Sequence, residues 1–167
     1  MDHLKESEQT VLKQTDLISK LKDILGQDHV LTDYESREFY SMDFSEEVSP
    51  IAIAVVRPQN VEQIAQIVLA AREHQAAVNT RGGGMSYTKG HVPINEQTVM
   101  IDNSLMNRVL KVNTVDRYVT LETGVRWVDL RVALKGTGFR VPYLGTLSGN
   151  HATVGGGLSQ NATGMGR

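Results

Sequence analysis

Glycine is unevenly distributed along this chain of 167 residues, and its placement constrains the fold more than any other feature. Of the 15 glycines, three form the run 82–84 and nine lie between Gly136 and Gly166. Glycine tolerates positive φ and lets the backbone approach another atom closely, because it has no Cβ. The sequence therefore predicts two segments in which main chain forms the contact surface.

The first glycine segment directly follows a strand candidate at 76–80. It consists of Arg81, Gly82, Gly83, Gly84, Met85, Ser86 and Tyr87. Consecutive glycines let backbone N–H groups converge on an anion, and the arginine and the serine add a charge and a hydroxyl donor. A phosphate or pyrophosphate is the expected ligand. A tight surface turn is the alternative interpretation of this segment taken alone.

Two well-known phosphate motifs do not fit this segment. The P-loop needs Gly-Lys before Ser or Thr, whereas Lys89 follows Thr88. The dinucleotide fingerprint has its third glycine where Tyr87 stands, and its loop follows the first strand of a βαβ unit rather than the second. We therefore expect no Rossmann dehydrogenase.

The second glycine segment, residues 144–164, carries hydroxyl side chains beside glycines. Ser148, Thr153 and Ser159 stand next to backbone amides that glycine leaves accessible. This combination suits a ligand rich in heteroatoms that lies flat against main chain. Local capping is the alternative interpretation, because serine and threonine commonly bond to nearby backbone in turns.

Hydrophobic periodicity predicts alternating helices and strands. The first dozen residues are expected to fray, Asp16 to cap the first helix, Gly26 to end it, and Trp127 to lie in the core. The first two strands and the helix between them form a right-handed βαβ unit. The strand candidates are 51–56, 76–80, 98–102, 108–113 and 118–123, and the helix candidates are 16–25, 34–40, 61–74 and 127–134.

Composition excludes several kinds of site. Seventeen Lys plus Arg against 19 Asp plus Glu give a net charge of −2, so we expect no nucleic-acid or anionic-membrane partner recognised by bulk charge. The absence of cysteine excludes disulfides and thiolate chemistry, and the five histidines show no metal-site spacing, so we expect no metal. Without a signal-like or membrane-spanning apolar stretch, we expect a cytoplasmic protein.

The order of the motifs closely resembles the FAD-binding domain of the vanillyl-alcohol oxidase/p-cresol methylhydroxylase (PCMH) family. The resemblance covers about residues 49–167, and the lead-in resembles the N-terminus of the glycolate oxidase and D-lactate dehydrogenase branch. The segments that carry it are 57–58, 81–87, 99–102, 106–109, 121–125, 152–157 and, in the lead-in, 21–26 and 30–33.

The resemblance implies an α+β fold, a PCMH-type FAD-binding domain. We expect a helical lead-in at 1–49 and the FAD-binding domain at 50–167. Within that domain, 50–80 form a small βαβ subdomain, and 97–167 begin a second subdomain of mainly antiparallel strands that is incomplete at its C-terminal side. FAD is expected between the two subdomains.

The resemblance also implies a set of cofactor contacts. Residues 81–87 hold the FAD phosphates through backbone amides and the Ser86 hydroxyl, and Pro142 and Tyr143 flank the cofactor. Relatives with a covalently tethered flavin have histidine where Met85 stands, and a thioether cannot form the same stable bond to the flavin methyl, so noncovalent FAD is expected. The second glycine segment is expected to contribute Ser148, Thr153, Gly155, Gly156, Ser159 and Thr163.

The resulting functional hypothesis is the FAD-binding portion of a flavin-dependent oxidoreductase that acts on a small hydroxylated substrate. The resemblance suggests a 2-hydroxy acid but leaves alcohols, sugars and amines open, and it assigns the substrate-activating residues to a later cap domain. That domain is missing here, so we expect a fragment or truncated product whose open sheet edge invites pairing.

Other functions remain open at this point. A non-catalytic FAD- or nucleotide-binding module, or half of a split enzyme whose partner chain completes the FAD site, is the alternative. A reductase of an enolpyruvyl sugar nucleotide, which shares this fold and needs NADPH, is a further possibility.

Overall fold

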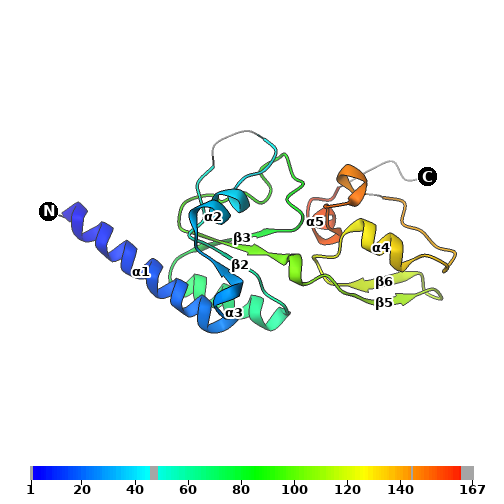
Figure 1. Ribbon diagram of the computed structural model, residues 1–167, viewed down its shortest axis with the longest axis horizontal. Coiled ribbons are helices and arrows are strands. Elements are labelled where there is room, and N and C mark those ends of the chain that lie inside the picture. The colour runs from blue at the N-terminus through cyan, green and yellow to red at the C-terminus, as the bar shows by residue number, and fades with distance from the viewer. Residues whose placement is uncertain (1, 46–48, 144, 163–167) are drawn as a thin grey trace. The chain divides into compact units, whose positions relative to one another are not determined.

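The computed structural model describes residues 2–45, 49–143 and 145–162, with backbone alone for residues 2–10. The chain divides into two compact units (Figure 1). The first unit comprises Met1–Met42, Glu46–Thr80 and His91–Asp102, and the second comprises Asp43–Ser45, Arg81–Gly90 and Asn103–Arg167.

The first unit combines α-helices with the strands of one sheet, and the second contains a hairpin followed by α-helices. The elements of the first are α1 (Asp2–Leu25), η1 (Gln27–His29), β1 (Val30–Leu31), α2 (Tyr34–Ser41), β2 (Ala54–Val56), α3 (Val61–Glu73), β3 (Ala77–Arg81, whose last residue belongs to the second unit) and β4 (Thr98–Asp102). The second contains η2 (Asn103–Leu105), β5 (Val109–Asn113), β6 (Tyr118–Leu121), α4 (Trp127–Ala133), η3 (Thr146–Gly149) and α5 (Val154–Ser159).

The sheet of the first unit has the strand order β1-β2-β4-β3. β2 pairs with β4 in parallel, with Ala54 opposite Val99, and β1 pairs with β2 antiparallel. All five residues of β4 are buried, as expected for a parallel strand covered on both faces. The prediction that 98–102 opens the second subdomain was therefore wrong: this strand lies between β2 and β3, inside the first sheet.

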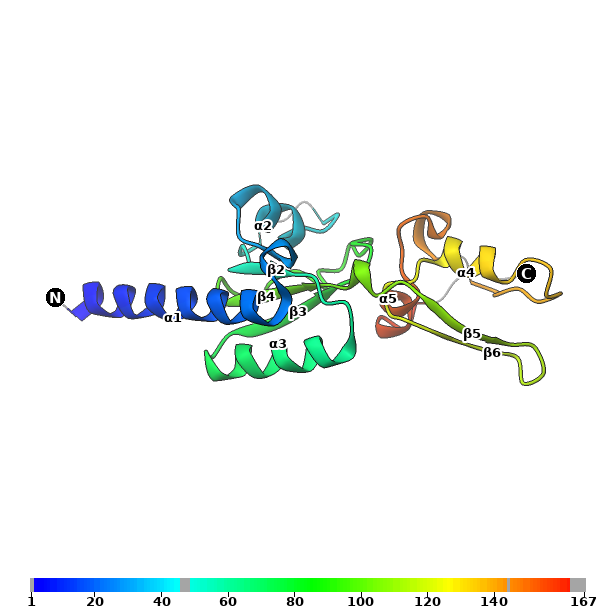
Figure 2. The same ribbon diagram turned by 60° about the horizontal axis from the view of Figure 1, so that its bottom comes forward.

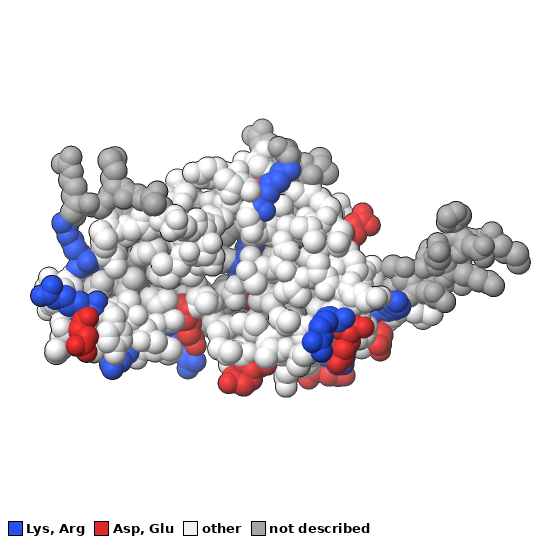
Figure 3. All heavy atoms as spheres, turned by 180° about the vertical axis from the view of Figure 1, so that it is seen from behind, with Lys and Arg blue, Asp and Glu red and all other residues white. Residues whose placement is uncertain are grey.

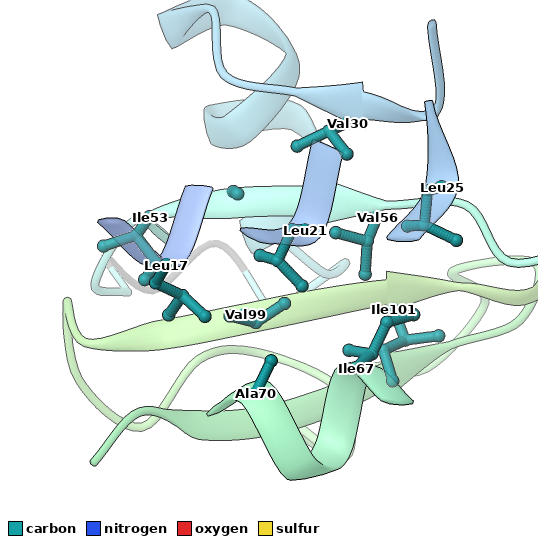
Figure 4. Packing of buried hydrophobic residues seen from close by; sticks show 11 residues of the cluster. Leu17, Leu21, Leu25, Val30, Ile53, Val56, Ile67, Ala70, Val99 and Ile101 are labelled. Atoms are coloured by element: carbon teal, nitrogen blue, oxygen red, sulfur yellow. The ribbon is translucent and has the colours of Figure 1, made fainter. Parts of the chain in front are cut away.

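Side-chain alternation along the strands divides the core of this unit into two layers. On one face, Val56, Val99 and Ile101 pack against α1 and α3 (Figure 4). On the other face, Val55 and Met100 pack with the partly buried Tyr40 of α2, and Figure 2 shows α2 and α3 on opposite sides of the sheet. The helices supply Leu17, Leu21, Leu25, Ile67 and Ala70 to the first layer.

Local signals set the ends of these helices. Asn60 Oδ1 accepts a hydrogen bond from the Gln63 backbone N–H at 2.9 Å and so caps α3. Helix α1 ends at Leu25, directly before Gly26, whose φ is 86°. The expectation of a frayed start and an N-cap at Asp16 was wrong, because α1 begins at Asp2 and the Asp16 carboxylate instead contacts His74.

The second unit is built on the antiparallel β5–β6 hairpin. Its register places Asn113 opposite Tyr118, and Asn113 Oδ1 accepts the backbone N–H groups of Val115 and Asp116 in the turn. Trp127 is 7% exposed, which confirms that it lies in the core. The buried cluster consists of Val125, Trp127, Leu130, Leu134 and Val154.

Charged side chains of both signs lie intermixed on the face seen in Figure 3, and most of the described surface in this view is uncharged. Lys20 pairs with Glu73, and Arg126 with Asp129, across short distances on the surface. Among the described residues, no helix has the combination of length and apolar character needed to cross a bilayer.

An imidazole joins α1 to the end of α3. His74 Nδ1 lies 2.8 Å from the Ala70 carbonyl oxygen, and its Nε2 lies 2.9 Å from Asp16 Oδ2. Both partners are acceptors, so the doubly protonated ring satisfies both contacts. The hydrogen bond to Asp16, followed by the one to Ala70, raises the pKa of His74 above its ordinary 6.5.

This raised pKa predicts a pH-dependent stabilisation of the first unit. The contribution is complete below the unfolded-state pKa and disappears as the pH rises through the higher folded-state pKa. Asp16→Asn should therefore lower the free energy of unfolding by a few tenths to about 1 kcal/mol near about pH 5.5 and by much less near about pH 9. Urea denaturation measures both values. Equal losses at the two pH values would contradict the pH-dependent role of the His74–Asp16 contact. Glu73→Gln is the control, and the free energy of unfolding that it removes should differ little between the two pH values.

Candidate functional site

The two glycine segments pack directly against each other in the second unit. A Cβ on Gly82 would lie 2.2 Å from Thr153 Oγ1, and a Cβ on Gly83 would lie 1.8 Å from the His151 carbonyl oxygen. Real Cβ atoms do not approach other heavy atoms this closely, so both positions require glycine. The contact brings together segments about 70 positions apart in the sequence.

Arg81 supports the first segment from its inner side. Its side chain is buried, at 8% exposure, and its guanidinium occupies the space beside Gly84, where a Cβ would lie 2.2 Å from Nη2. Gly84 also has a φ of 67°, which disfavours a side chain. The Arg81 carbonyl accepts a hydrogen bond from Asn103 Nδ2 at 3.3 Å. The arginine thus shapes the loop as well as adding positive charge beneath it.

The loop presents backbone donors. Within the part of the chain that the structure describes, the N–H groups of Gly83, Gly84 and Met85 form no hydrogen bond, although Gly84 is buried and the other two are half-buried. Backbone donors with so little exposure normally have partners. Consecutive backbone N–H groups can converge on an anion, so this loop is a candidate for such a site.

The far end of the loop is held by side chains. Ser86 is buried, and its Oγ accepts hydrogen bonds from Gln160 Nε2 at 3.0 Å and from the Thr88 N–H at 3.3 Å. Asp43 Oδ2 accepts the Lys89 backbone N–H at 2.7 Å. Tyr87, by contrast, is 68% exposed.

The hydroxyls of the second segment make local contacts. Thr153 Oγ1 accepts the Gly156 N–H at 3.2 Å and caps α5. The Ser159 hydroxyl donates to the Gly155 carbonyl at 2.9 Å. Ser148 is exposed in η3 and has a φ of 59°, while Thr163 lies outside the described residues. Hydrogen bonds to nearby backbone are thus present at Thr153 and Ser159, and the one at Thr153 is a helix cap.

Trp127 positions the second segment. A Cβ on Gly145 would lie 2.3 Å from Trp127 Cδ1, and a Cβ on Gly157 would lie 3.1 Å from Cζ2. The Tyr143 ring packs edge-on against the indole, with centroids 4.9 Å apart. Tyr143, expected to flank the cofactor, therefore packs on the core tryptophan.

An ion pair braces the base of the hairpin. Glu122 Oε1 lies 2.6 Å from Arg108 Nη2, and Glu122 Oε2 accepts the Arg108 backbone N–H at 2.8 Å. The side-chain hydrogen bond from Arg108, followed by its backbone N–H, lowers the pKa of the Glu122 carboxyl. This carboxylate braces the hairpin, and its lowered pKa makes it a weaker base than an ordinary glutamate.

Sequence reasoning missed Gln160 and Gly90. Gln160 contacts Ser86 from 74 positions away, and Gly90 is a single glycine whose Cβ would lie 2.5 Å from Gln160 Nε2. Neither residue has a local signal, because a glutamine at a helix end and a glycine in a loop are both ordinary. The clustering of hydroxyls near glycine could have suggested a polar partner for Ser86, without naming it.

Comparison with known proteins identifies the family. A family model described as an FAD-binding domain matches residues 52–167. The chain belongs to this family, and FAD is its cofactor. The expected recognition and the α+β, PCMH-type fold class are confirmed.

Curated relatives and a solved structure agree with this assignment. D-2-hydroxyglutarate dehydrogenase of Stutzerimonas stutzeri is 30% identical over 149 residues, which cover 89% of this chain and 32% of that protein. Mitochondrial D-lactate dehydrogenase (cytochrome) of Arabidopsis thaliana is 34% identical over 130 residues, or 76% of this chain and 22% of the relative. A p-cresol methylhydroxylase structure with substrate bound superposes with a TM-score of 0.80 at 20% identity, covering 91% of this chain and 30% of the other. The chain thus spans a third or less of these relatives.

The contact between the glycine segments predicts a strong steric effect. Gly83→Ala should lower the free energy of unfolding by about 1–3 kcal/mol, because its Cβ meets rigid backbone at His151. The measurement is the urea unfolding curve of the chain. Gly156→Ala is the matched control, since its Cβ meets a hydroxyl at 3.0 Å, and it should cost less. A smaller loss for Gly83→Ala than for the control would refute the packing described here.

Proposed function

We propose that this FAD-binding domain holds the pyrophosphate of a noncovalent FAD with its two glycine segments, as part of an oxidoreductase that acts on a small 2-hydroxy acid. The observation that carries the proposal is the row of unpaired N–H groups at Gly83, Gly84 and Met85. An anion with several oxygens can accept all three donors at once.

The chemistry of the surrounding residues supports this placement. Ser86 lies at the end of the row and adds a hydroxyl, and Arg81 adds a positive charge beneath the loop. Anionic oxygens form stronger hydrogen bonds than neutral ones. The proposed contacts from the first segment are Arg81, Gly82, Gly83, Gly84, Met85, Ser86 and Tyr87, and those from the second are Ser148, Thr153, Gly155, Gly156, Ser159 and Thr163.

Met85 supports a noncovalent cofactor. It is half-buried in the loop and carries a neutral thioether, which forms no stable bond to the flavin methyl. The described part of this chain therefore offers backbone donors and a hydroxyl to the cofactor, and no nucleophile at the position where family members with a covalently tethered flavin carry histidine.

The substrate class is supported by what the relatives' names say they act on, D-2-hydroxyglutarate and D-lactate. FAD, when bound, supplies a two-electron oxidation. The residues of this chain bind the cofactor and orient it. We infer that the substrate is held by a cap domain or a partner chain outside these residues, and a cytoplasmic location remains a prediction from the sequence.

The first experiment is a calorimetric titration of the 167-residue chain with FAD, FMN and ADP. We expect FAD to bind more tightly than FMN, because FMN lacks the pyrophosphate, and ADP to bind measurably. Acid precipitation of the FAD complex should leave the yellow colour in the supernatant. Equal affinity for FAD and FMN would refute the pyrophosphate assignment, and colour retained in the pellet would refute noncovalent binding.

The second experiment tests the reaction. The reaction needs the substrate-holding part as well, so the test uses the FAD complex of this domain together with the cap domain or partner chain. Anaerobic addition of D-2-hydroxyglutarate, D-lactate or glycolate to that complex should bleach the flavin absorbance, because a 2-hydroxy acid donates two electrons to it. A simple alcohol and a sugar serve as controls and should bleach it more slowly. If the complex with the substrate-holding part binds FAD but none of the acids bleaches it, the oxidoreductase proposal fails and a non-catalytic FAD module is the better description.

A further inference from the structure

We propose that Gln160 is a positioning residue that makes the Ser86 hydroxyl a pure donor toward the cofactor's phosphates. This inference rests on the proposed function and extends it to a residue outside the glycine motifs. The juxtaposition that suggests it is the 3.0 Å contact between Gln160 Nε2 and Ser86 Oγ.

Counting donors and acceptors at Ser86 gives the argument. A hydroxyl accepts two hydrogen bonds and donates one. The Gln160 amide fills one acceptor site and the Thr88 N–H at 3.3 Å fills the other. Only the Ser86 O–H then remains for a ligand. The hydroxyl can donate a hydrogen bond to a ligand oxygen but cannot accept one from a ligand donor.

The remaining proton has an exchangeable partner. Thr88 Oγ1 lies 3.2 Å from Ser86 Oγ, at the long end for a hydrogen bond between hydroxyls. Thr88 is exposed, so water can replace this contact. A phosphate oxygen offers a shorter, charge-assisted bond. The Ser86 O–H can therefore turn from Thr88 to a phosphate oxygen at little cost.

The surrounding backbone makes room for Gln160. A Cβ on Gly90 would lie 2.5 Å from Gln160 Nε2, so glycine at this position lets the amide reach Ser86. The Gln160 backbone N–H bonds to the Gly156 carbonyl at 3.1 Å and closes α5. Helix α5 is capped by Thr153, which also packs on Gly82. Gln160 thus joins the two glycine segments at a second point, next to the row of free N–H groups.

A double-mutant cycle on FAD affinity tests this role. Ser86→Ala should weaken FAD binding about 10- to 100-fold, because it removes a hydrogen bond to a charged group. Gln160→Ala should weaken it about 3- to 10-fold in the wild-type background and hardly at all in Ser86→Ala, because Gln160 acts through the hydroxyl. Affinity for ADP should fall in parallel, since ADP carries the same pyrophosphate.

Gln160→Glu distinguishes orientation from packing. A carboxylate accepts hydrogen bonds but does not donate them. It should accept the hydrogen bond of the Ser86 O–H, which then no longer reaches the phosphate, so FAD binding should weaken more than in Gln160→Ala. Part of this extra loss should disappear in the Ser86→Ala background, leaving the effect of the negative charge alone. Gln160→Met keeps the length of the side chain without a donor and should match Gln160→Ala, which covers the case in which the alanine variant unfolds.

Controls and outcomes separate this inference from the function on which it rests. Gln14→Ala removes a comparable amide contact, to Gln97 Oε1 at 2.9 Å in the first unit, and should leave FAD affinity unchanged. Additive losses from Gln160→Ala and Ser86→Ala, or no loss from Gln160→Ala, would overturn the positioning role while FAD binding by the wild type stands. A wild-type chain that binds neither FAD nor ADP would instead overturn the proposed function.

Discussion

The site depends on the close approach of the Gly82–Gly83 backbone to residues 151–153, where Gly82 meets the Thr153 side chain and Gly83 meets the His151 backbone. A Cβ at either glycine would overlap Thr153 or His151, so the contact exists only because two side chains are missing. Close packing of this kind places the backbone of both segments rigidly. In the proposed pyrophosphate site, a rigid main chain reduces the conformational entropy that the backbone loses when it binds an anion.

The rest of the second unit keeps these segments in place. Trp127 lies against Gly145 and Gly157, and the Val154 N–H bonds to the Val125 carbonyl at 2.8 Å. A large aromatic side chain thus provides the wall on which a glycine-rich segment, with few side chains of its own, can pack. In the first unit the corresponding constraint is β4, whose complete burial requires a helix on each face of the sheet.

Much of this organisation could be predicted where the signals are local. The cap of α3 by Asn60 follows from a side chain that bonds three residues away, and the strand at 98–102 follows from a short apolar run. The glycine loop was recognisable because consecutive glycines are rare. Two predictions were wrong for a shared reason. The N-cap at Asp16 and the assignment of residues 98–102 to the second subdomain both failed because contacts remote in sequence decide them. His74 engages Asp16, and β2 pairs with β4.

The sequence by itself determined the kinds of element present and their order, and, through its glycines, where other atoms approach the backbone closely. These properties depend on φ, on capping and on periodicity, all of which act within a few residues. Only the tertiary structure decided that β4 separates β2 from β3, that Arg81 lies beneath its own loop, and that Gln160 meets Ser86. Such contacts depend on the burial of apolar surface summed over the whole unit and on the space that a glycine leaves, and neither quantity is visible in a local pattern.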